Sequence, residues 1–166
     1  MSGWNDHQQK VVNRVISDWK WLIDREWLEW YYSGRPYQRV GRRPIAKFNG
    51  DCTGTIKLVN CDWNGIPPWD GEALGYGNTR TFANQTKKGY FLQLNPKEWQ
   101  PLDILLYKHH SGPFIGGSHE HAAQLIYKEN GVWIVASMGS DSGPKAERWN
   151  YRNDLAKVLR FPIPLK

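Results

Sequence analysis

The chain has 166 residues and a mass of 19.3 kDa, which suits one compact domain better than two. With 40% hydrophobic and 23% charged residues it can form a core, so disordered and collagen-like chains are excluded. Its longest apolar runs are far below the roughly 18 residues of a membrane span, and we expect a soluble protein. Ten tryptophans and a net charge of +6 leave open a nucleic-acid partner, an anionic polymer, or an aromatic core.

The first predicted element is a long amphipathic helix over residues 11–31. Its apolar residues recur at spacings of three and four, as in Val12, Val15, Trp19 and Leu22. The aromatic residues of this stripe are therefore expected to pack rather than to bind a ligand.

A basic connector over residues 35–49 follows the first helix. It contains five basic residues and no acidic one: Arg35, Arg39, Arg42, Arg43 and Lys47. Such a segment is either a solvated loop or a rim that faces an anion.

Asp51 is predicted to cap a helix that runs from Cys52 to about Trp63 and ends at the Gly-Ile-Pro-Pro of residues 65–68. A weaker helix is expected over residues 78–88. Five strands then follow, at residues 90–94, 103–107, 120–128, 132–138 and 157–161. Asn130 and Gly131 form a hairpin turn between the third and fourth strands. Helices followed by neighbouring strands predict an α+β domain with an antiparallel sheet.

The two cysteines, Cys52 and Cys61, fall in one predicted helix. At ~1.5 Å per residue they are separated by about 13 Å, too far for a disulfide. We therefore expect two free thiols, as in a reducing compartment. The first residues show no basic stretch followed by an apolar one, so no secretory signal is predicted.

Cys52 is the first candidate for chemistry because it lies in the first turn of a predicted helix. Unpaired backbone N–H groups and the helix dipole stabilise a thiolate there, and the Cys52 N–H can hold an oxyanion. Gly54 would let another chain approach closely. The alternative is a buried structural cysteine, the commoner fate of this residue type.

His121 is the second candidate, because it opens an otherwise apolar strand. If this strand packs on the Cys52 helix, the imidazole can take the thiol proton and later protonate a leaving amine.

These segments together resemble a known family. Asp51-Cys52-Thr53-Gly54, the run at residues 101–107, and the hairpin that His121 opens resemble the NlpC-type peptidoglycan peptidases of the papain-like cysteine peptidase superfamily. Residues 135–144 and the closing strand at 157–162 look like the peptidase domains of endolysins from phages of actinobacteria. The resemblance covers roughly residues 37–166.

The resemblance implies an α+β, papain-like NlpC-type fold, with N-terminal helices packed on a central antiparallel sheet of about five strands. Residues 1–166 would form one peptidase domain, with a leading helix in 1–34 and a catalytic region in 35–166. It further implies a cysteine peptidase that cuts an amide in stem or cross-bridge peptides, with Cys52 as nucleophile and His121 as base and acid. No cofactor and no metal are expected. An N-acetylmuramoyl-alanine amidase would use the same catalytic pair.

Five further residues are expected at the substrate by this resemblance: Tyr37, Asp51, Thr53, Gly54 and His119. The chain also departs from the family pattern. Leu102 stands where a glycine usually precedes the aspartate. The third catalytic position falls near Ser137 and Met138, and a methionine cannot usefully accept a hydrogen bond from an imidazole. Ser137, Asp141 or a backbone carbonyl then orients His121, or the triad is reduced to a dyad.

Two alternatives to an active cysteine peptidase are open. His119 and His121 share one face of their strand, and His109 or His110 could complete a zinc site like that of lysostaphin-type peptidases. That family's upstream histidine, with an aspartate four residues on, is missing. The second alternative is a catalytically impaired relative that binds the wall.

The expected partner is bacterial peptidoglycan, with anionic wall polymers binding the basic segment from Arg35 to Lys47. Nucleic acid is not expected, because no fold-specific motif for it appears, and no membrane partner is expected. We expect a monomeric lysin made in the host cytoplasm that acts on the cell wall or is carried in the virion.

Overall fold

The computed structural model describes residues 3–32, 35–41, 46–67, 91–92, 95–108, 119–139, 143–160 and 162–166. The helices are α1 (Asp6–Ile23), α2 (Cys52–Lys57), the π-helix η1 (Leu58–Asp62), and the 3-10 helices η5 (Pro96–Glu98) and η7 (Trp149–Tyr151). The strands are β1 (Trp27–Tyr32), β2 (Arg35–Gly41), β3 (Ala46–Asn49), β4 (Phe91–Leu92), β5 (Ile104–Lys108), β6 (His119–Glu129), β7 (Val132–Gly139), β8 (Gly143–Arg148) and β9 (Leu155–Leu159). No helix within these ranges is long and apolar enough to cross a membrane.

The first helix, α1, is shorter than its sequence pattern predicts. A capping box between Asn5 and Gln8 starts it, and Val15 and Trp19 of its apolar stripe are fully buried. It ends at Ile23, and the prediction of a helix to residue 31 is wrong, because residues 27–32 form β1. Aromatic residues three apart fit a helical stripe, but they also favour strands, and here the strand forms.

The segment predicted as a connector builds a small second sheet. β1 pairs with β2 antiparallel and with β3 parallel, in the order β2-β1-β3. The prediction of a loop over residues 35–49 is therefore wrong where β2 and β3 form. Leu28 and Trp30 of this sheet pack with Phe48 and with Met138 of β7, which joins the small sheet to the large one.

The helix that begins at Cys52 is confirmed, with Asp51 as its N-cap. α2 continues directly into η1, where the Trp63 N–H donates to the Leu58 carbonyl at 3.0 Å. This widened turn carries Asn60 on its buried side. The weaker helix predicted over residues 78–88 lies outside the described residues.

The large sheet has six antiparallel strands in the order β4-β9-β5-β6-β7-β8. All five predicted strands are present within a few residues, and β8 is a sixth that has no apolar alternation to reveal it. Asn130 and Gly131 have φ values of 52° and 79°, the left-handed pair that a tight hairpin turn requires. The α+β class with an antiparallel sheet is confirmed.

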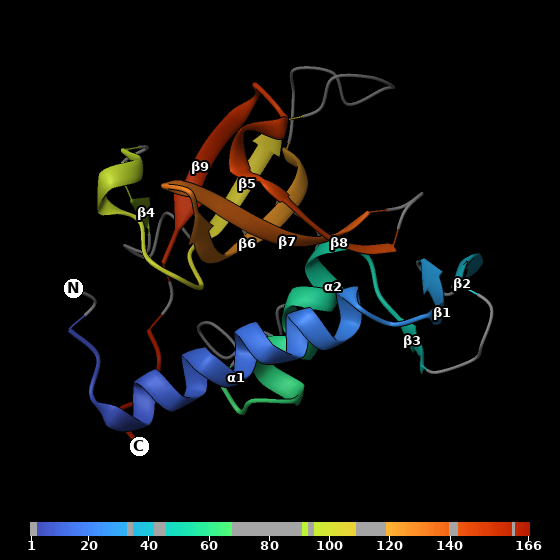
Figure 1. Cartoon of the computed structure of the whole chain (residues 1–166), viewed down its shortest axis with the longest axis horizontal. Helices are drawn as coiled ribbons and strands as arrows, with labels where there is room; N and C mark the ends of the chain where they lie inside the picture. Colours follow the sequence, from blue (N-terminus) through green and yellow to red (C-terminus); the bar gives the residue numbers. More distant parts are fainter. Residues whose placement is uncertain are drawn as a thin grey trace.

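Two apolar layers lie on opposite faces of this sheet. One contains residues of α1, α2, β5, β6 and β7, among them Ile56, Leu106 and Ala122. The other contains Tyr107 and Ala123 on the far face. Figure 1 shows α1 and α2 together along one side of the large sheet, with the small sheet beyond them. This arrangement brings the start of α2 against the middle of the large sheet.

Candidate active site

Cys52 lies at the N-terminus of α2 with its side chain buried. Burial raises the pKa of its thiol to about 12, and the neighbouring Asp51 carboxylate adds to this rise. The backbone N–H groups of Ala122, Thr53 and Cys52 act in the opposite direction, because they face the sulfur and favour its charged form. At neutral pH the resting group is therefore a thiol, and a base must remove its proton before it can attack.

The Ala122 contact places the sulfur against the backbone of β6 at the residue that follows His121. α2 packs on both β6 and β7. The expected packing of the His121 strand on the Cys52 helix is thus present. The role of the two residues in proton transfer stays a prediction.

His121 faces Tyr107 of β5 across the sheet, and their ring centroids are 6.2 Å apart. A register shift follows directly, because Lys108 pairs with His119. Such bulges change the direction of nearby side chains. The Tyr107 ring is fixed in turn, since its hydroxyl donates to the Trp149 carbonyl at 2.6 Å. The imidazole therefore has a rigid aromatic neighbour on the far face of the sheet, whereas the sulfur approaches from the α2 side.

Asp51 and its neighbours form a closed cap. The Asp51 carboxylate accepts from the Gly54 N–H at 2.7 Å and from the Thr53 hydroxyl at 3.1 Å. Thr53 is fully buried, and a Cβ on Gly54 would lie 3.0 Å from the Asp51 carboxylate oxygen. The group that closely approaches Gly54 is therefore the Asp51 carboxylate of the cap. Contact of these three residues with a substrate stays a prediction.

The third catalytic position stays a prediction. Ser137 is buried in β7 and faces Lys145 of β8. It lies toward the His121 end of the strand pair, one residue beyond Ala136, which faces Gln124. Met138 is buried in the apolar cluster with Leu28 and Trp30, so its side chain joins the two sheets.

Several predicted residues lie where the structure gives no side chain. Asp141, His109 and His110 are outside the described residues, and for Tyr37 and His119 only the backbone is described. The side chains of the basic segment at residues 35–47 are not described either. The zinc alternative, the substrate contacts of Tyr37 and His119, and the anionic rim therefore stay predictions.

A buried polar cluster joins β6, which carries His121, to η1, which directly continues the helix that Cys52 begins. No motif in the sequence predicted it. Gln124 of β6 and Asn60 of η1 exchange two hydrogen bonds, each of 2.8 Å. The Trp19 indole N–H donates to the same Gln124 oxygen at 2.8 Å. The glutamine inside an otherwise apolar strand is the signal from which this cluster could have been predicted. The cluster fixes β6 relative to α1 and η1.

Leu102 adopts a backbone conformation that glycine adopts more readily than leucine. Its φ is 75°, in the left-handed region. Its N–H donates to the Leu125 carbonyl at 2.7 Å, which ties this turn to β6. The side chain is buried in the α1–α2 layer, so the strained turn also contributes to the core.

No protein-family model and no curated protein matches the sequence. Solved structures are similar in fold. An NlpC/P60 family protein from Bacillus cereus ATCC 10987 aligns over 92% of this chain and 40% of its own, with 15% identity and a TM-score of 0.51. A protein of the NLP/P60 family described as similar to lipoprotein, from Staphylococcus aureus Mu50, aligns over 95% and 42%, with 19% identity and a TM-score of 0.49. The chain spans less than half the length of either protein.

At such identities the likeness concerns the fold alone. The Bacillus cereus protein shares the arrangement of helices packed on an antiparallel sheet. The expected NlpC-type architecture is confirmed, and the fold of this chain is that of the NlpC/P60 protein from Bacillus cereus.

Proposed function

We propose that this chain is a cysteine peptidase that hydrolyses an amide bond in the stem or cross-bridge peptides of bacterial peptidoglycan. One observation carries the proposal: the Cys52 thiol, at a capped helix N-terminus, contacts the backbone N–H of the residue that follows His121. The NlpC/P60 fold supports the substrate class.

His121 removes the thiol proton as Cys52 attacks the substrate carbonyl. Because burial raises the thiol pKa to about 12, the thiolate forms only when a base takes its proton. The proposal therefore requires the His121 imidazole to turn from the Tyr107 side of β6 toward the sulfur. The backbone N–H groups at the start of α2 hold the oxyanion. His121 then gives its proton to the leaving amine, which leaves a thioester on the sulfur. Water attacks this thioester, and the acid product and the free thiol are released.

The third member of the site is nonstandard. Met138 serves the apolar contact with the small sheet, and it cannot orient an imidazole. We propose that Ser137, Asp141 or a backbone carbonyl takes this role. Loss of one orienting group weakens such catalysis without abolishing it.

The finer assignment is a phage lysin. Its supports are the similarity of residues 135–144 to actinobacteriophage endolysins and the two unbridged cysteines, which suit synthesis in a host cytoplasm. It would act as a monomer on the wall, or from the virion, with anionic wall polymers at the basic segment.

Purified peptidoglycan tests the proposal. The wild-type protein is expected to release peptide fragments, Cys52→Ala is expected to release none, and Cys61→Ala serves as the matched control because Cys61 is the other free cysteine. Mass spectrometry of the fragments then distinguishes an endopeptidase from an amidase by the bond that is cut. Hydrolysis that survives Cys52→Ala but not a zinc chelator would overturn the mechanism in favour of a metal site. Wall binding without any fragment would favour the impaired relative.

A further inference from the structure

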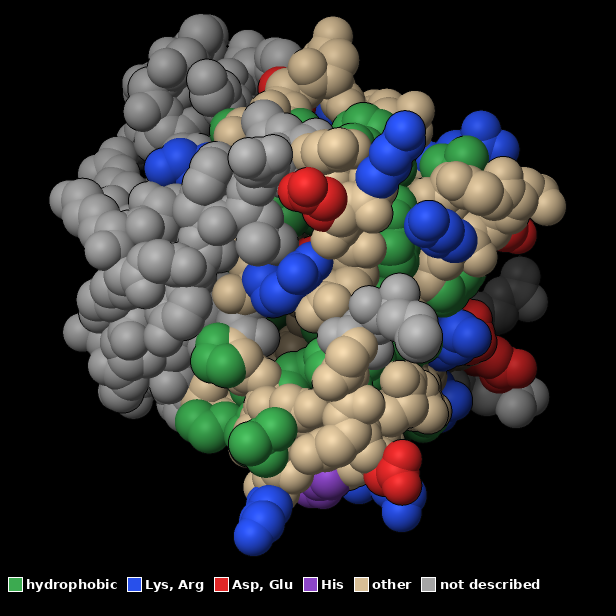
Figure 2. Space-filling view, turned by 90° about the vertical axis from the view of Figure 1, so that its left-hand side faces the viewer, with side chains coloured by type: hydrophobic (Ala, Val, Ile, Leu, Met, Phe, Trp, Pro, Cys, Tyr) green, Lys and Arg blue, Asp and Glu red, His purple; other side chains and the backbone are tan. Residues whose placement is uncertain are grey.

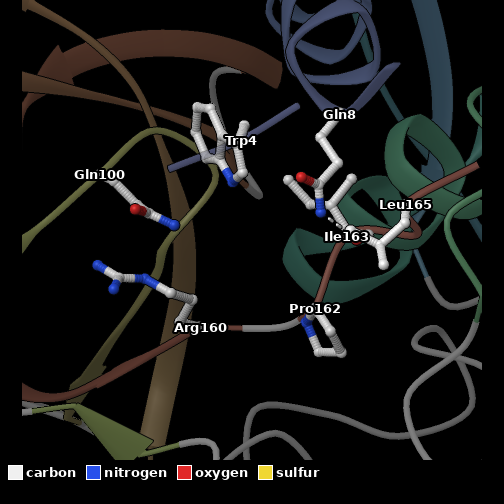
Figure 3. A pocket seen from close by; sticks show the side chains of 7 residues that line it. All are labelled: Trp4, Gln8, Gln100, Arg160, Pro162, Ile163 and Leu165. Atoms are coloured by element: carbon white, nitrogen blue, oxygen red, sulfur yellow. Dashed lines mark hydrogen bonds between the residues drawn. The ribbon is translucent and has the colours of Figure 1, made fainter. Parts of the chain in front are cut away.

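A groove of about 510 Å³ lies outside the candidate active site. Figure 3 shows Trp4, Gln100 and Arg160 on one side of it and Ile163 and Leu165 on the other. Arg160 directly follows β9, and Gln100 precedes β5. His121 pairs with the far end of β5, about 10 Å along the strand. The groove and the Cys52 site are therefore separate, but they belong to one continuous sheet.

Hydrogen bonds fix the walls of this groove. The Gln8 side chain donates to the Ile163 carbonyl at 2.8 Å, and the Asn5 side chain donates to the Leu165 carbonyl at 3.0 Å. These bonds hold the last residues of the chain against the start of α1. A preformed site of this kind loses little conformational entropy when a ligand binds.

The charge of Arg160 is balanced within the protein. Its guanidinium donates twice to the buried Asp103 carboxylate, at 2.8 and 2.9 Å, and once to the Glu98 carbonyl at 2.7 Å. An anion would therefore meet no uncompensated positive charge from Arg160. On the face that Figure 2 shows, the described Lys and Arg side chains are dispersed rather than gathered in one patch.

Two hydrogen-bonding groups without uncompensated charge remain in the groove. Among the described residues, neither the Gln100 carboxamide nor the Arg160 Nη1 has a hydrogen-bond partner, while Trp4 offers an aromatic surface beside them. A purely apolar ligand would leave the two polar groups unpaired, at a cost in affinity. The lining favours a neutral ligand that carries both hydroxyl or amide groups and apolar faces.

We propose that this groove binds a neutral chain of N-acetylated amino sugars. A sugar ring has a C–H face for Trp4 and equatorial polar groups for Gln100 and Arg160, and its acetamido methyl fits Ile163 and Leu165. This inference deepens the proposed function and rests on it for the natural polymer. The glycan strand of peptidoglycan would be held here while its peptide reaches Cys52.

Binding is tested with the tetramer of N-acetylglucosamine, followed by isothermal calorimetry and by NMR of the side-chain amides. Gln100→Ala is expected to weaken binding about fivefold, the loss of one ordinary hydrogen bond. Gln9→Ala is the matched control, since Gln9 is exposed on α1 and its side chain donates to the Asn13 side chain of the same helix. The de-acetylated tetramer should bind more weakly than the acetylated one.

Three results would overturn the inference: no binding of the tetramer at millimolar concentration, equal losses in Gln100→Ala and Gln9→Ala, or stronger binding of an anionic polymer that the tetramer displaces. The outcome is separable from that of the proposed function. Cys52→Ala should bind the tetramer like the wild type while releasing no wall fragment. Tetramer binding by a wild-type protein that never cuts peptidoglycan would refute the peptidase and leave the sugar site standing.

Discussion

Gln124→Leu is expected to destabilise the fold strongly, because it removes the centre of the buried polar cluster. The Gln124 carboxamide accepts from Trp19 and Asn60, and it donates to Asn60 and, at 3.2 Å, to the Leu102 carbonyl. Leucine is similar in size, so the substitution leaves no large cavity. Its effect therefore reports on hydrogen bonding rather than on lost volume.

The magnitude follows from the groups that would lose their partner. The Trp19 N–H and the Asn60 carbonyl oxygen depend on Gln124, whereas the Asn60 amide keeps its bond to the Ile56 carbonyl at 2.8 Å. A buried polar group without a partner costs about 1–3 kcal/mol, so two such groups cost about 4 kcal/mol. For a domain of this size the melting temperature should fall by about 10 °C.

Urea denaturation followed by far-UV circular dichroism measures this loss, with Gln9→Leu as the exposed control. Adding Asn60→Leu to Gln124→Leu should recover part of the stability, because removing both partners leaves fewer buried groups unpaired. A Gln124→Leu variant within about 1 kcal/mol of the wild type would refute the reasoning that this cluster holds β6 in place.

Three further predictions concern single residues. Leu102→Gly relieves a left-handed backbone that costs about 1 kcal/mol, but it removes a buried side chain that contributes about 3 kcal/mol. We therefore expect urea denaturation to show a net loss of about 2 kcal/mol in the free energy of unfolding. A more stable variant would mean that backbone strain outweighs packing. Gly50→Ala would place a Cβ 2.7 Å from the Thr55 hydroxyl oxygen, and we expect the free energy of unfolding to fall by about 1–3 kcal/mol. Adding Thr55→Ala should restore part of this stability. An unchanged melting temperature in Gly50→Ala would contradict the close contact. Because burial raises the pKa of Cys52 from 9.0 to about 12, the folded state keeps a proton that the unfolded state loses, and stability should fall as the pH rises from 9.0 towards 12. Cys52→Ala should make stability less dependent on pH in this range. If stability falls with pH as steeply in Cys52→Ala as in the wild type, the Cys52 thiol is not the cause.

Local signals in the sequence were sufficient for the parts of the fold that depend on local geometry. The Asp51 cap, the helix from Cys52 and the turn at Asn130 and Gly131 each require particular residues at particular positions. His121 was identified because a histidine opened an apolar strand. The packing of that strand on α2 was a condition of the prediction, and the contacts between α2 and β6 meet it.

The small sheet could not be predicted in this way. β2 and β3 gain their partners from β1, and the parallel pairing of β1 with β3 spans residues far apart in the chain. The tryptophans at 27 and 30 satisfied a helical spacing by coincidence. The packing role of Met138 could not be predicted either, because its contact with Trp30 exists only once the small sheet has formed. From the sequence alone, Met138 was therefore interpreted as a departure from the catalytic pattern.

The buried cluster and the candidate active site share β6 and the continuous helical segment of α2 and η1. Asn60 follows Cys52 by eight residues along α2 and η1, and Gln124 follows His121 by three residues along β6. The Asn60–Gln124 pair therefore fixes the register in which the Cys52 sulfur meets the backbone beside His121. A thiol whose pKa is about 12 becomes reactive only through a base in a defined position, so small shifts between these elements should reduce catalysis more than they reduce stability. The tryptophan-rich composition contributes to the same end, because the buried Trp19 indole is the third member of this cluster.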